Sequence, residues 1–234
     1  MTITPIKTRI FLENENLEKF IDEYIPAVQE NTIIVITSKI VALSEGRTYD
    51  DDSEEARETL IRQESEWMLK TKYVWLTLKD GMLAASAGID ASNANGKLIL
   101  LPKNSFQTAK QIRDALRKKY SLTNLGVLIT DSRLLPLRAG ALAYAIGYAG
   151  FRGVRDNRVK PDIFGRELLY SQTDVADGLA SSAVICMGEG AEQIPLCIIT
   201  DPPVEWTDDP IDPNELRIPP EDDLYRPFFE NLPD

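Results

Sequence analysis

TIIVITSKIVALSEGR, residues 32 to 47, is the stretch that decides the fold. Its first six residues are all β-branched, and such a continuous run is typical of a strand that is buried on both faces of a sheet. The run passes directly into SKIVALSEGR, where Ser38 is expected to cap a short helix. A buried strand that is followed at once by a helix indicates the α/β class.

The rest of the chain alternates between strand-like and helix-like segments, which fits the same class. The predicted helices span residues 16–30, 50–70, 104–120 and 173–190. The helix at 104–120 places Ala109, Ile112 and Leu116 on one face, and the helix at 173–190 starts at a Thr173 cap and ends in glycines. The predicted strands span residues 8–11, 73–78, 126–130 and 196–200, with strand-like pieces at 82–88 and 97–101.

The C-terminal end differs in composition from the rest. Of the net charge of −11, −9 falls on residues 201–234, which hold eleven acidic and two basic side chains and eight of the fourteen prolines. Such a composition is usual in a disordered tail, but Trp206, Tyr225, Phe228 and Phe229 supply aromatic anchors. We therefore expect residues 1–200 to form the functional unit. Residues 201–234 are expected to form an acidic, proline-rich arm that packs partly on the body or on a partner subunit.

Bulk properties exclude several classes of function. The chain has no histidine, which removes the usual general base, the Ser-His and Cys-His nucleophile pairs and the imidazole zinc sites. Any bound metal is therefore expected to be a hard cation held by oxygen atoms. No basic face dominates the chain, which argues against nucleic-acid binding. No segment approaches the ~20 apolar residues of a membrane span.

The terminus and the cysteines indicate a cytoplasmic protein. The N-terminal MTITPIKTRIF lacks the apolar core and the cleavage site of a signal peptide. Cys186 and Cys197 both lie in apolar stretches. We expect two buried side chains in a reducing compartment rather than a disulfide or a metal-binding pair.

Two candidate positions lie before the middle of the chain, and each also has a plain structural explanation. In TSK, residues 37–39, the backbone N–H groups of a helix start and Lys39 would suit a phosphate. Taken alone, a capped helix with a solvated lysine explains this segment better, because no Gly-rich Walker loop is present. In AGIDASNANG, residues 87–96, Asp90 would bind a metal and Asn93 a ligand, whereas the local sequence by itself favours a hairpin turn.

Two further candidates lie in the second half. In LITDS, residues 128–132, Asp131 follows an apolar strand, and ligands gather at strand ends in α/β proteins; an N-cap or turn aspartate fits equally well. In MGEGAEQIP, residues 187–195, glycines flank Glu189 just past a predicted helix. This segment is either a helix cap with its loop or a loop that lies on a nucleotide, with Glu189 reaching a metal. Together, the three carboxylates and Lys39 would fit a divalent ion that bridges nucleotide phosphates.

An ordered set of motifs resembles one known family. The segments are TSKIVALSEGR, AGIDASN, PKNSFQTAKQIR, LITD, RAG followed four residues later by AIGYAG, FGREL and TDVADGLASSAVICMGEG, which together span roughly residues 32–199. They are similar to the coenzyme F420-0:L-glutamate ligases, also called F420-0 γ-glutamyl ligases. The resemblance implies an α/β fold of mixed sheets with helices and an intertwined homodimer, with residues 1–200 as the catalytic unit.

The resemblance also implies an activity. Members of the family are amide ligases that typically use GTP, with Mg²⁺ or Mn²⁺ and often K⁺, although ATP stays an alternative for this chain. The terminal carboxylate of the acceptor is activated as an acyl phosphate, and the α-amine of L-glutamate then attacks it. Carried over by position, the metal ligands would be Asp90, Asp131, Ser132 and Glu189. The nucleotide contacts would be Ser38, Lys39, Asn93, Met187, Gly188 and Gly190.

The sequence departs from the family pattern after the second aspartate. The F420 enzymes usually continue with a Gly-Arg-Pro-Trp-Arg type segment, whereas this chain reads DSRLLPLRAG, residues 131–140. Arg138 keeps the basic position before Ala139-Gly140 and is the candidate catalytic residue facing the acceptor. A changed acceptor is therefore expected. The alternatives are a folate γ-glutamyl ligase, acting on dihydrofolate or tetrahydrofolate, a ligase for another amino acid and carboxylate, and a catalytically silent nucleotide-binding member of the family.

Overall fold

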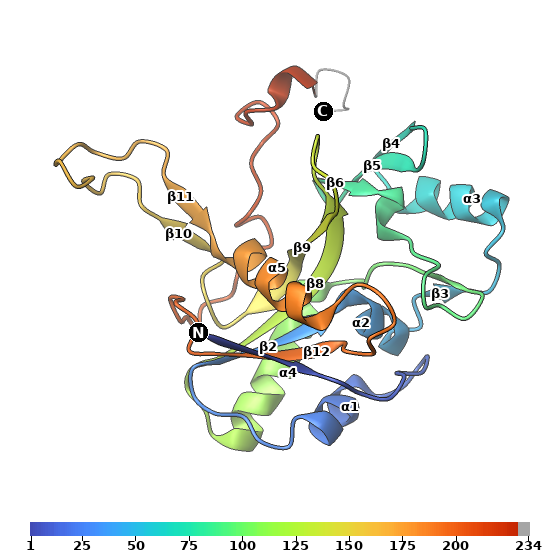
Figure 1. The fold of residues 1–234 in the computed structure, drawn as a ribbon, viewed down its shortest axis with the longest axis horizontal. Helices are drawn as coiled ribbons and strands as arrows, with labels where there is room; N and C mark the ends of the chain where they lie inside the picture. Colours follow the sequence, from blue (N-terminus) through green and yellow to red (C-terminus); the bar gives the residue numbers. More distant parts are fainter. Residues whose placement is uncertain (229–234) are drawn as a thin grey trace.

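The computed structural model describes residues 1–228, and a mixed five-stranded sheet forms its centre (Figure 1). From one edge to the other, the strands are β1 (Thr2–Ile6), β12 (Leu196–Thr200), β2 (Thr32–Thr37), β8 (Leu125–Leu134) and β9 (Ala141–Ala149). Strands β2 and β8 run parallel, and the other neighbours run antiparallel. The fold is thus α/β with mixed pairing, as the sequence predicted.

Helices cover both faces of this sheet, which explains the uninterrupted β-branched run in β2. Helices α1 (Leu17–Tyr24) and α4 (Ser105–Tyr120) pack on one face, and α5 (Val175–Met187) packs on the other (Figure 1). Ile34 and Ile36 belong to the core under α1 and α4. Ile33 and Val35 belong to the core under α5. Because successive residues of a strand point to opposite faces, a strand covered on both sides needs apolar side chains throughout.

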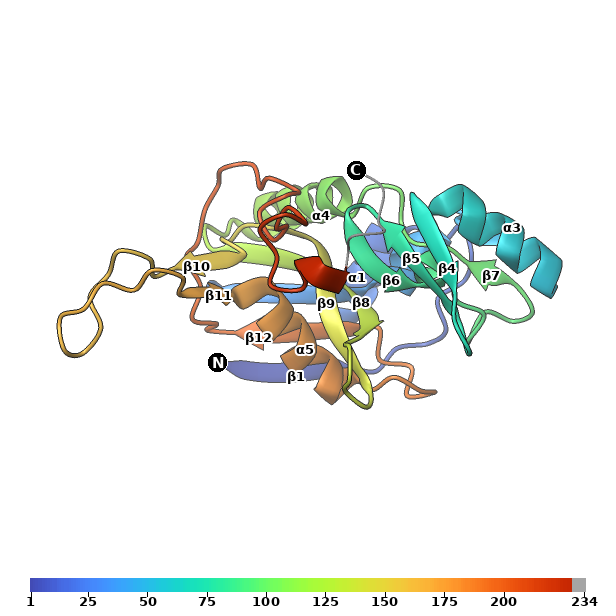
Figure 2. The same cartoon turned by 90° about the horizontal axis from the view of Figure 1, so that it is seen from above.

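A second, smaller lobe lies beside the carboxyl ends of β2 and β8 (Figure 2). Helix α2 (Ser38–Ser44), whose Ile40 and Val41 belong to the core under α1 and α4, leads into this lobe. The elements of the lobe are β3 (Thr48–Tyr49), α3 (Glu54–Glu64), β4 (Trp67–Lys70), β5 (Trp75–Lys79), β6 (Met82–Ala85), the one-turn element η1 (Ser86–Gly88) and β7 (Leu98–Ile99). Strands β4, β5 and β6 form an antiparallel sheet, and β3 pairs with β7. A separate apolar cluster around Ile61, Ile89 and Leu98 holds this lobe together.

A two-stranded arm projects from the opposite end of the molecule (Figures 1 and 2). Its strands are β10 (Val154–Asp156) and β11 (Gln172–Asp174), which pair antiparallel. The loop between them carries large apolar side chains that are almost fully exposed, with Ile163 at 92%, Phe164 at 89% and Tyr170 at 90%.

The C-terminal arm packs on the body over much of its described length. Its side chains Val204, Trp206, Ile211 and Leu216 lie against the core under α5. The buried guanidinium of Arg113 on α4 binds the Asp208 carboxylate and the Thr207 carbonyl. A short 3₁₀ turn, η2, covers Arg226–Phe228. Of the expected aromatic anchors, Trp206 packs as predicted, Tyr225 is half exposed, and Phe229 lies outside the described residues.

Several predicted boundaries were wrong, each for a local reason. Residues 8–11 form no strand, because the N-terminal strand is β1, paired with β12. The helix predicted at 16–30 ends at Tyr24, shortly before Pro26, which cannot continue a helix. The helix predicted at 50–70 ends at Glu64, and its last residues form β4, where Trp67–Lys70 pair with β5.

Two further corrections concern α5. Its N-cap is Asp174, whose side chain accepts a hydrogen bond from the Asp177 N–H, whereas Thr173 belongs to β11. The predicted glycine end is confirmed, with Gly188 at the C-cap. Cys197 is buried as expected, but Cys186 is exposed on α5. Within residues 1–228, no helix is long and apolar enough to cross a membrane.

Candidate active site

The candidate site begins where the two parallel strands stop pairing. Thr37 and Thr130 form the last pair between β2 and β8. Beyond it β2 turns into α2, while β8 continues to Leu134, paired with β9. The prediction that Asp131 follows the end of its strand was therefore wrong, although Asp131 does stand at the end of the parallel pairing, where ligands gather in α/β proteins.

Ser38 faces Asp131 rather than capping a helix. Thr37 holds the N-cap position of α2 without a side-chain hydrogen bond. The Ser38 hydroxyl instead donates to Oδ1 of Asp131 at 2.7 Å. The predicted cap was wrong because a neighbouring carboxylate, which the local sequence does not reveal, takes this hydroxyl.

The negative charge of the buried Asp131 carboxylate is only partly offset by its surroundings. Burial raises its pKa to about 6, although hydrogen bonds from Ser38 and from the Ser132 backbone act in the opposite direction. The nearby charge of Asp90 raises the pKa further, and Lys39 lowers it only weakly. A carboxylate withdrawn from water without a direct cation partner is electrostatically incomplete.

Lys39 binds the loop that contains the second aspartate. Its Nζ lies 2.8 Å from Oδ2 of Asp90, and it also donates to the carbonyl oxygen of Ser92 at 2.6 Å. Ser92 donates from its backbone and from its hydroxyl to Asp90, at 2.7 and 2.6 Å. Burial acts to raise the pKa of Asp90, but the hydrogen bonds from Lys39 and Ser92 outweigh it and hold the pKa below the ordinary value.

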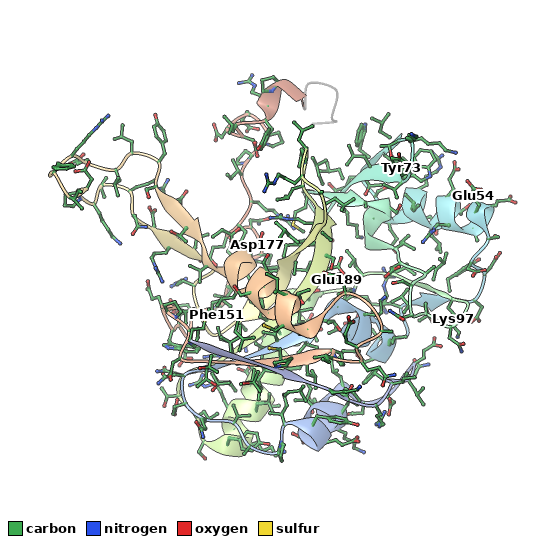
Figure 3. The ribbon with its side chains drawn as sticks, viewed as in Figure 1. Glu54, Tyr73, Lys97, Phe151, Asp177 and Glu189 are labelled. Atoms are coloured by element: carbon green, nitrogen blue, oxygen red, sulfur yellow. The ribbon has the colours of Figure 1, made fainter. Side chains whose placement is uncertain are left out.

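The loop after α5 closes the site from the other side. The Ser132 hydroxyl lies 2.9 and 2.8 Å from the two carboxylate oxygens of Glu189, and Figure 3 labels Glu189 just past the end of α5. The Asn93 amide donates to the Gly190 carbonyl at 3.0 Å. Four segments that are far apart in the sequence thus form one closed ring of contacts, which we call the site ring. Its members are Ser38, Lys39, Asp90, Ser92, Asn93, Asp131, Ser132, Glu189 and Gly190.

Two predicted nucleotide contacts lie beside the site ring. The Met187 side chain is buried in the core under α5, so only its backbone is available for a ligand. Gly188 has a positive φ of 86°, and a Cβ there would come within 2.5 Å of the Glu192 carboxylate. Gly190 donates its N–H to the same carboxylate at 2.8 Å. Glu192 therefore shapes this loop, although the sequence did not single it out.

The structure does not bring Arg138 into the site ring. Arg138 lies exposed in the turn between β8 and β9, and its backbone N–H bonds to the Leu135 carbonyl. A different arginine is anchored nearby, since Arg133 pairs with Asp177 of α5 at 2.6 Å and lies over the Tyr144 ring. Sequence reasoning missed this group. Its only signal was a basic residue two positions after Asp131.

The oxygen donors in the site fit a hard divalent cation of a particular kind. Within residues 1–228, no three acidic or cysteine side chains come close enough to hold a metal by themselves, so Glu189 does not join both aspartates in one cluster. Asp90 and Asp131 are nevertheless close enough that the charge of Asp90 raises the pKa of Asp131. The buried hydroxyl of Thr130, which precedes Asp131 in β8, lacks a hydrogen-bond partner among the described residues. Two carboxylates with hydroxyls suit Mg²⁺, which usually takes its other ligands from phosphate and water.

Comparison with known proteins gives a consistent match. A sequence profile of the family described as F420-0:Gamma-glutamyl ligase matches residues 5–201, which include every member of the site ring. The coenzyme F420:L-glutamate ligase of Methanocaldococcus jannaschii is 32% identical over 232 residues, covering 92% of this chain and 91% of that protein. The protein of the same name from Methanococcus maripaludis strain C7 is also 32% identical over 232 residues, covering 92% of each.

Proposed function

The chain belongs to the F420-0:gamma-glutamyl ligase family, and on this premise we propose that it joins L-glutamate to the terminal carboxylate of F420-0 or of a related acceptor. The reaction uses GTP, or ATP in its place, and Mg²⁺ or Mn²⁺, with K⁺ as a further ion. The observation that supports this proposal is the site ring. It joins Lys39 to Asp90, Ser38 to Asp131 and Ser132 to Glu189, where β2 and β8 stop pairing.

The chemistry proceeds in two displacement steps. In the first, a carboxylate oxygen of the acceptor attacks the γ-phosphorus, the bond to the β-phosphate oxygen breaks, and nucleoside diphosphate leaves. In the second, the amine of L-glutamate attacks the acyl carbon of this acyl phosphate, the bond from that carbon to the phosphate oxygen breaks, and inorganic phosphate leaves. The glutamate ammonium loses its proton to a carboxylate or to water before it attacks.

The described residues suit the electrostatic demands of these steps. A carboxylate and a nucleoside triphosphate repel each other, so fixed positive charge must offset the approach. A divalent ion held by Asp90, Asp131 and the Ser132 hydroxyl would supply most of that charge. Lys39, which pairs with Asp90, would contact the phosphates. Asn93 and the Gly188–Gly190 backbone fix the loop that borders the same point.

The composition of the turn between β8 and β9 favours an alternative acceptor. Its leucines Leu134 and Leu137 are exposed, and Arg138 is a basic residue of the same turn. An apolar turn suits an acceptor with an uncharged ring system better than a strongly anionic one. Dihydrofolate and tetrahydrofolate carry such a ring and end in a glutamate carboxylate, so folate γ-glutamyl ligation is the second candidate function.

We also propose that two copies of the chain pair as a homodimer. The projecting β10–β11 arm leaves Ile163, Phe164 and Tyr170 in water, and an exposed apolar cluster of this kind usually marks an interface. We further propose that the protein is located in the cytoplasm, as its sequence led us to expect.

One assay tests the activity. The purified protein is incubated with GTP or ATP, Mg²⁺ or Mn²⁺, L-glutamate and either F420-0 or tetrahydrofolate monoglutamate, and products are analysed by mass spectrometry. The expected product is heavier by one glutamyl unit and absent when the metal is omitted. A product with only one acceptor decides between the two functions. If neither acceptor is extended while the protein still binds nucleotide with metal, the chain is either a silent member of the family or a ligase for another amino acid and carboxylate.

A further inference from the structure

A left-handed turn leads the chain into Asp90. The three residues of η1, Ser86, Ala87 and Gly88, have φ angles of 51°, 54° and 72°. Two of these residues carry a Cβ, and the left-handed conformation is unfavourable for them. Position 88 requires glycine, because a Cβ there would lie 2.5 Å from the Leu101 side chain. Strained backbone of this kind persists only where the surroundings hold it, and it clusters at functional sites.

One buried hydroxyl holds the turn in place. Thr77 of β5 is completely buried. Its Oγ1 accepts a hydrogen bond from the Ala87 N–H at 2.9 Å and donates to the Ala84 carbonyl at 2.7 Å. The same hydroxyl therefore joins the end of β6 to the middle of the left-handed turn.

Backbone hydrogen bonds connect this turn to Asp90 in the site ring. The Ile89 N–H closes the turn on the Ser86 carbonyl, and Asp90 then exchanges two backbone hydrogen bonds with Ile99, at 3.0 and 2.8 Å. Only Gly88 and Ile89 lie between the anchored Ala87 and Asp90. The Asp90 carboxylate is then met by Lys39 and Ser92 at 2.6 to 2.8 Å, so a small shift of the turn would misalign it.

We propose that Thr77 is a positioning residue that sets the Asp90 carboxylate for nucleotide and metal binding by holding the left-handed turn. This inference rests on the proposed function, in which Asp90 contributes to binding of the metal–nucleotide complex. Thr77 touches neither ligand. It acts through Ala87 and the backbone that leads to Asp90.

The test compares two substitutions at Thr77. Thr77→Val keeps the shape of the side chain but leaves the buried Ala87 N–H without an acceptor, whereas Thr77→Ser restores the hydroxyl. We expect Thr77→Val to weaken MgGTP binding and to raise the KM for MgGTP about tenfold, the lower end of the roughly 10- to 100-fold losses that follow removal of a group that orients a metal ligand, with a smaller change in kcat. Thr77→Ser is expected to bind as the wild type does. Hydrogen exchange of residues 86–92 should accelerate in Thr77→Val and not in Thr77→Ser.

Controls separate positioning from a general loss of stability. Thr8→Val removes another buried threonine hydroxyl, whose hydrogen bond goes to the Arg9 carbonyl, and should lower the melting temperature without changing MgGTP binding. In an Asp90→Asn background, Thr77→Val should cause no further loss of MgGTP binding. Wild-type affinity and unchanged exchange in Thr77→Val would overturn the proposal.

A failure of the proposed function gives a different result. If the wild-type protein binds neither MgGTP nor MgATP, the role of Asp90 in ligand binding is refuted. The exchange measurement then still decides whether Thr77 holds the turn.

Discussion

Lys39 and Asp90 are 51 residues apart in the sequence, yet the lysine Nζ lies 2.8 Å from the aspartate Oδ2. The two groups follow different structural paths to this point, one at the start of α2 and the other after the left-handed turn η1. The lysine offsets the charge of a proposed metal ligand. When a metal–nucleotide complex binds, we expect the cation to take over Asp90 and Lys39 to turn to the phosphates.

Asp90→Ala is expected to abolish metal-dependent turnover while the fold stays intact. The Asp90 side chain is half exposed, so its removal leaves little buried charge unpaired. The loss in kcat/KM should exceed the roughly 10- to 100-fold seen when an outer partner of a metal ligand is removed. Asp114→Ala, which removes an exposed carboxylate from α4, serves as the control. Normal turnover in Asp90→Ala would show that the metal assignment is wrong.

The contribution of Asp131 to the stability of the metal-free protein is expected to fall as the pH rises from about 4 to 6. Burial raises the pKa of Asp131 from an ordinary value of 3.8 to about 6, so in this window the folded protein keeps a proton that the unfolded chain has lost. The part of the free energy of unfolding that depends on Asp131 then decreases with pH, by on the order of 2–3 kcal/mol.

Asp131→Asn isolates this effect from the other titrating groups. The asparagine keeps an acceptor for the Ser38 hydroxyl but cannot ionise. In urea unfolding with EDTA, the variant should match the wild type near pH 3.5 and exceed its stability at pH 7. An equal difference between the two proteins at both pH values would mean that the carboxylate is not desolvated.

Glu215→Ala is expected to loosen the C-terminal arm. The Glu215 carboxylate accepts hydrogen bonds from the buried Tyr148 hydroxyl and from the Gly153 N–H, and both donors would be left unpaired. We expect a loss of about 1–3 kcal/mol, which lowers the Tm by several degrees in a chain of this size. Glu221→Ala, at an exposed position of the same arm, should leave the Tm unchanged. Equal Tm values for the two variants would contradict the packed arm.

Two glycine substitutions should have opposite effects on stability. A Cβ at Gly147 of β9 would lie 2.4 Å from the Ser105 carbonyl carbon at the start of α4, so Gly147→Ala forces two backbones apart and should cost about 1–3 kcal/mol. A Cβ at Gly178 of α5 meets no atom within 4 Å. Gly178→Ala should therefore stabilise the protein by about 0.5–1 kcal/mol, through helix propensity alone. Chemical unfolding of both variants measures the difference, and the same sign for both would refute the close approach of α4 to β9.

Phe164→Asp is expected to convert a homodimer into a monomer. Phe164 lies at the tip of the β10–β11 arm with 89% of its surface exposed, and a buried interface charge without a partner is strongly unfavourable. Light scattering coupled to size-exclusion chromatography gives the mass of each variant. Leu12→Asp, which places the same charge at an exposed leucine elsewhere, should leave the mass unchanged. A wild-type protein that elutes as a monomer would rule out the proposed pairing.

Much of the architecture could be predicted from local patterns. The β-branched run of β2, the apolar face of α4 with Ala109, Ile112 and Leu116, and the glycine end of α5 were each confirmed. These features depend on neighbouring residues, because periodicity and capping act over a few positions. The boundaries of α3 and β4 were predicted wrongly, since Trp67–Lys70 become a strand only through pairing with β5.

The sequence by itself determined which residues are chemically available in this protein. Without histidine, and with Asp90, Asp131, Glu189 and Lys39 at the ends of predicted elements, it indicated an oxygen-ligand, nucleotide-binding site. Only the tertiary structure decided how those groups meet. In the folded chain, the Ser38 hydroxyl donates to Asp131 and the Ser132 hydroxyl donates to Glu189. The Thr77 hydroxyl accepts from Ala87 in the turn before Asp90. These contacts link residues 10 to 93 positions apart, and the packing of the two lobes, rather than any local preference of the chain, sets their geometry.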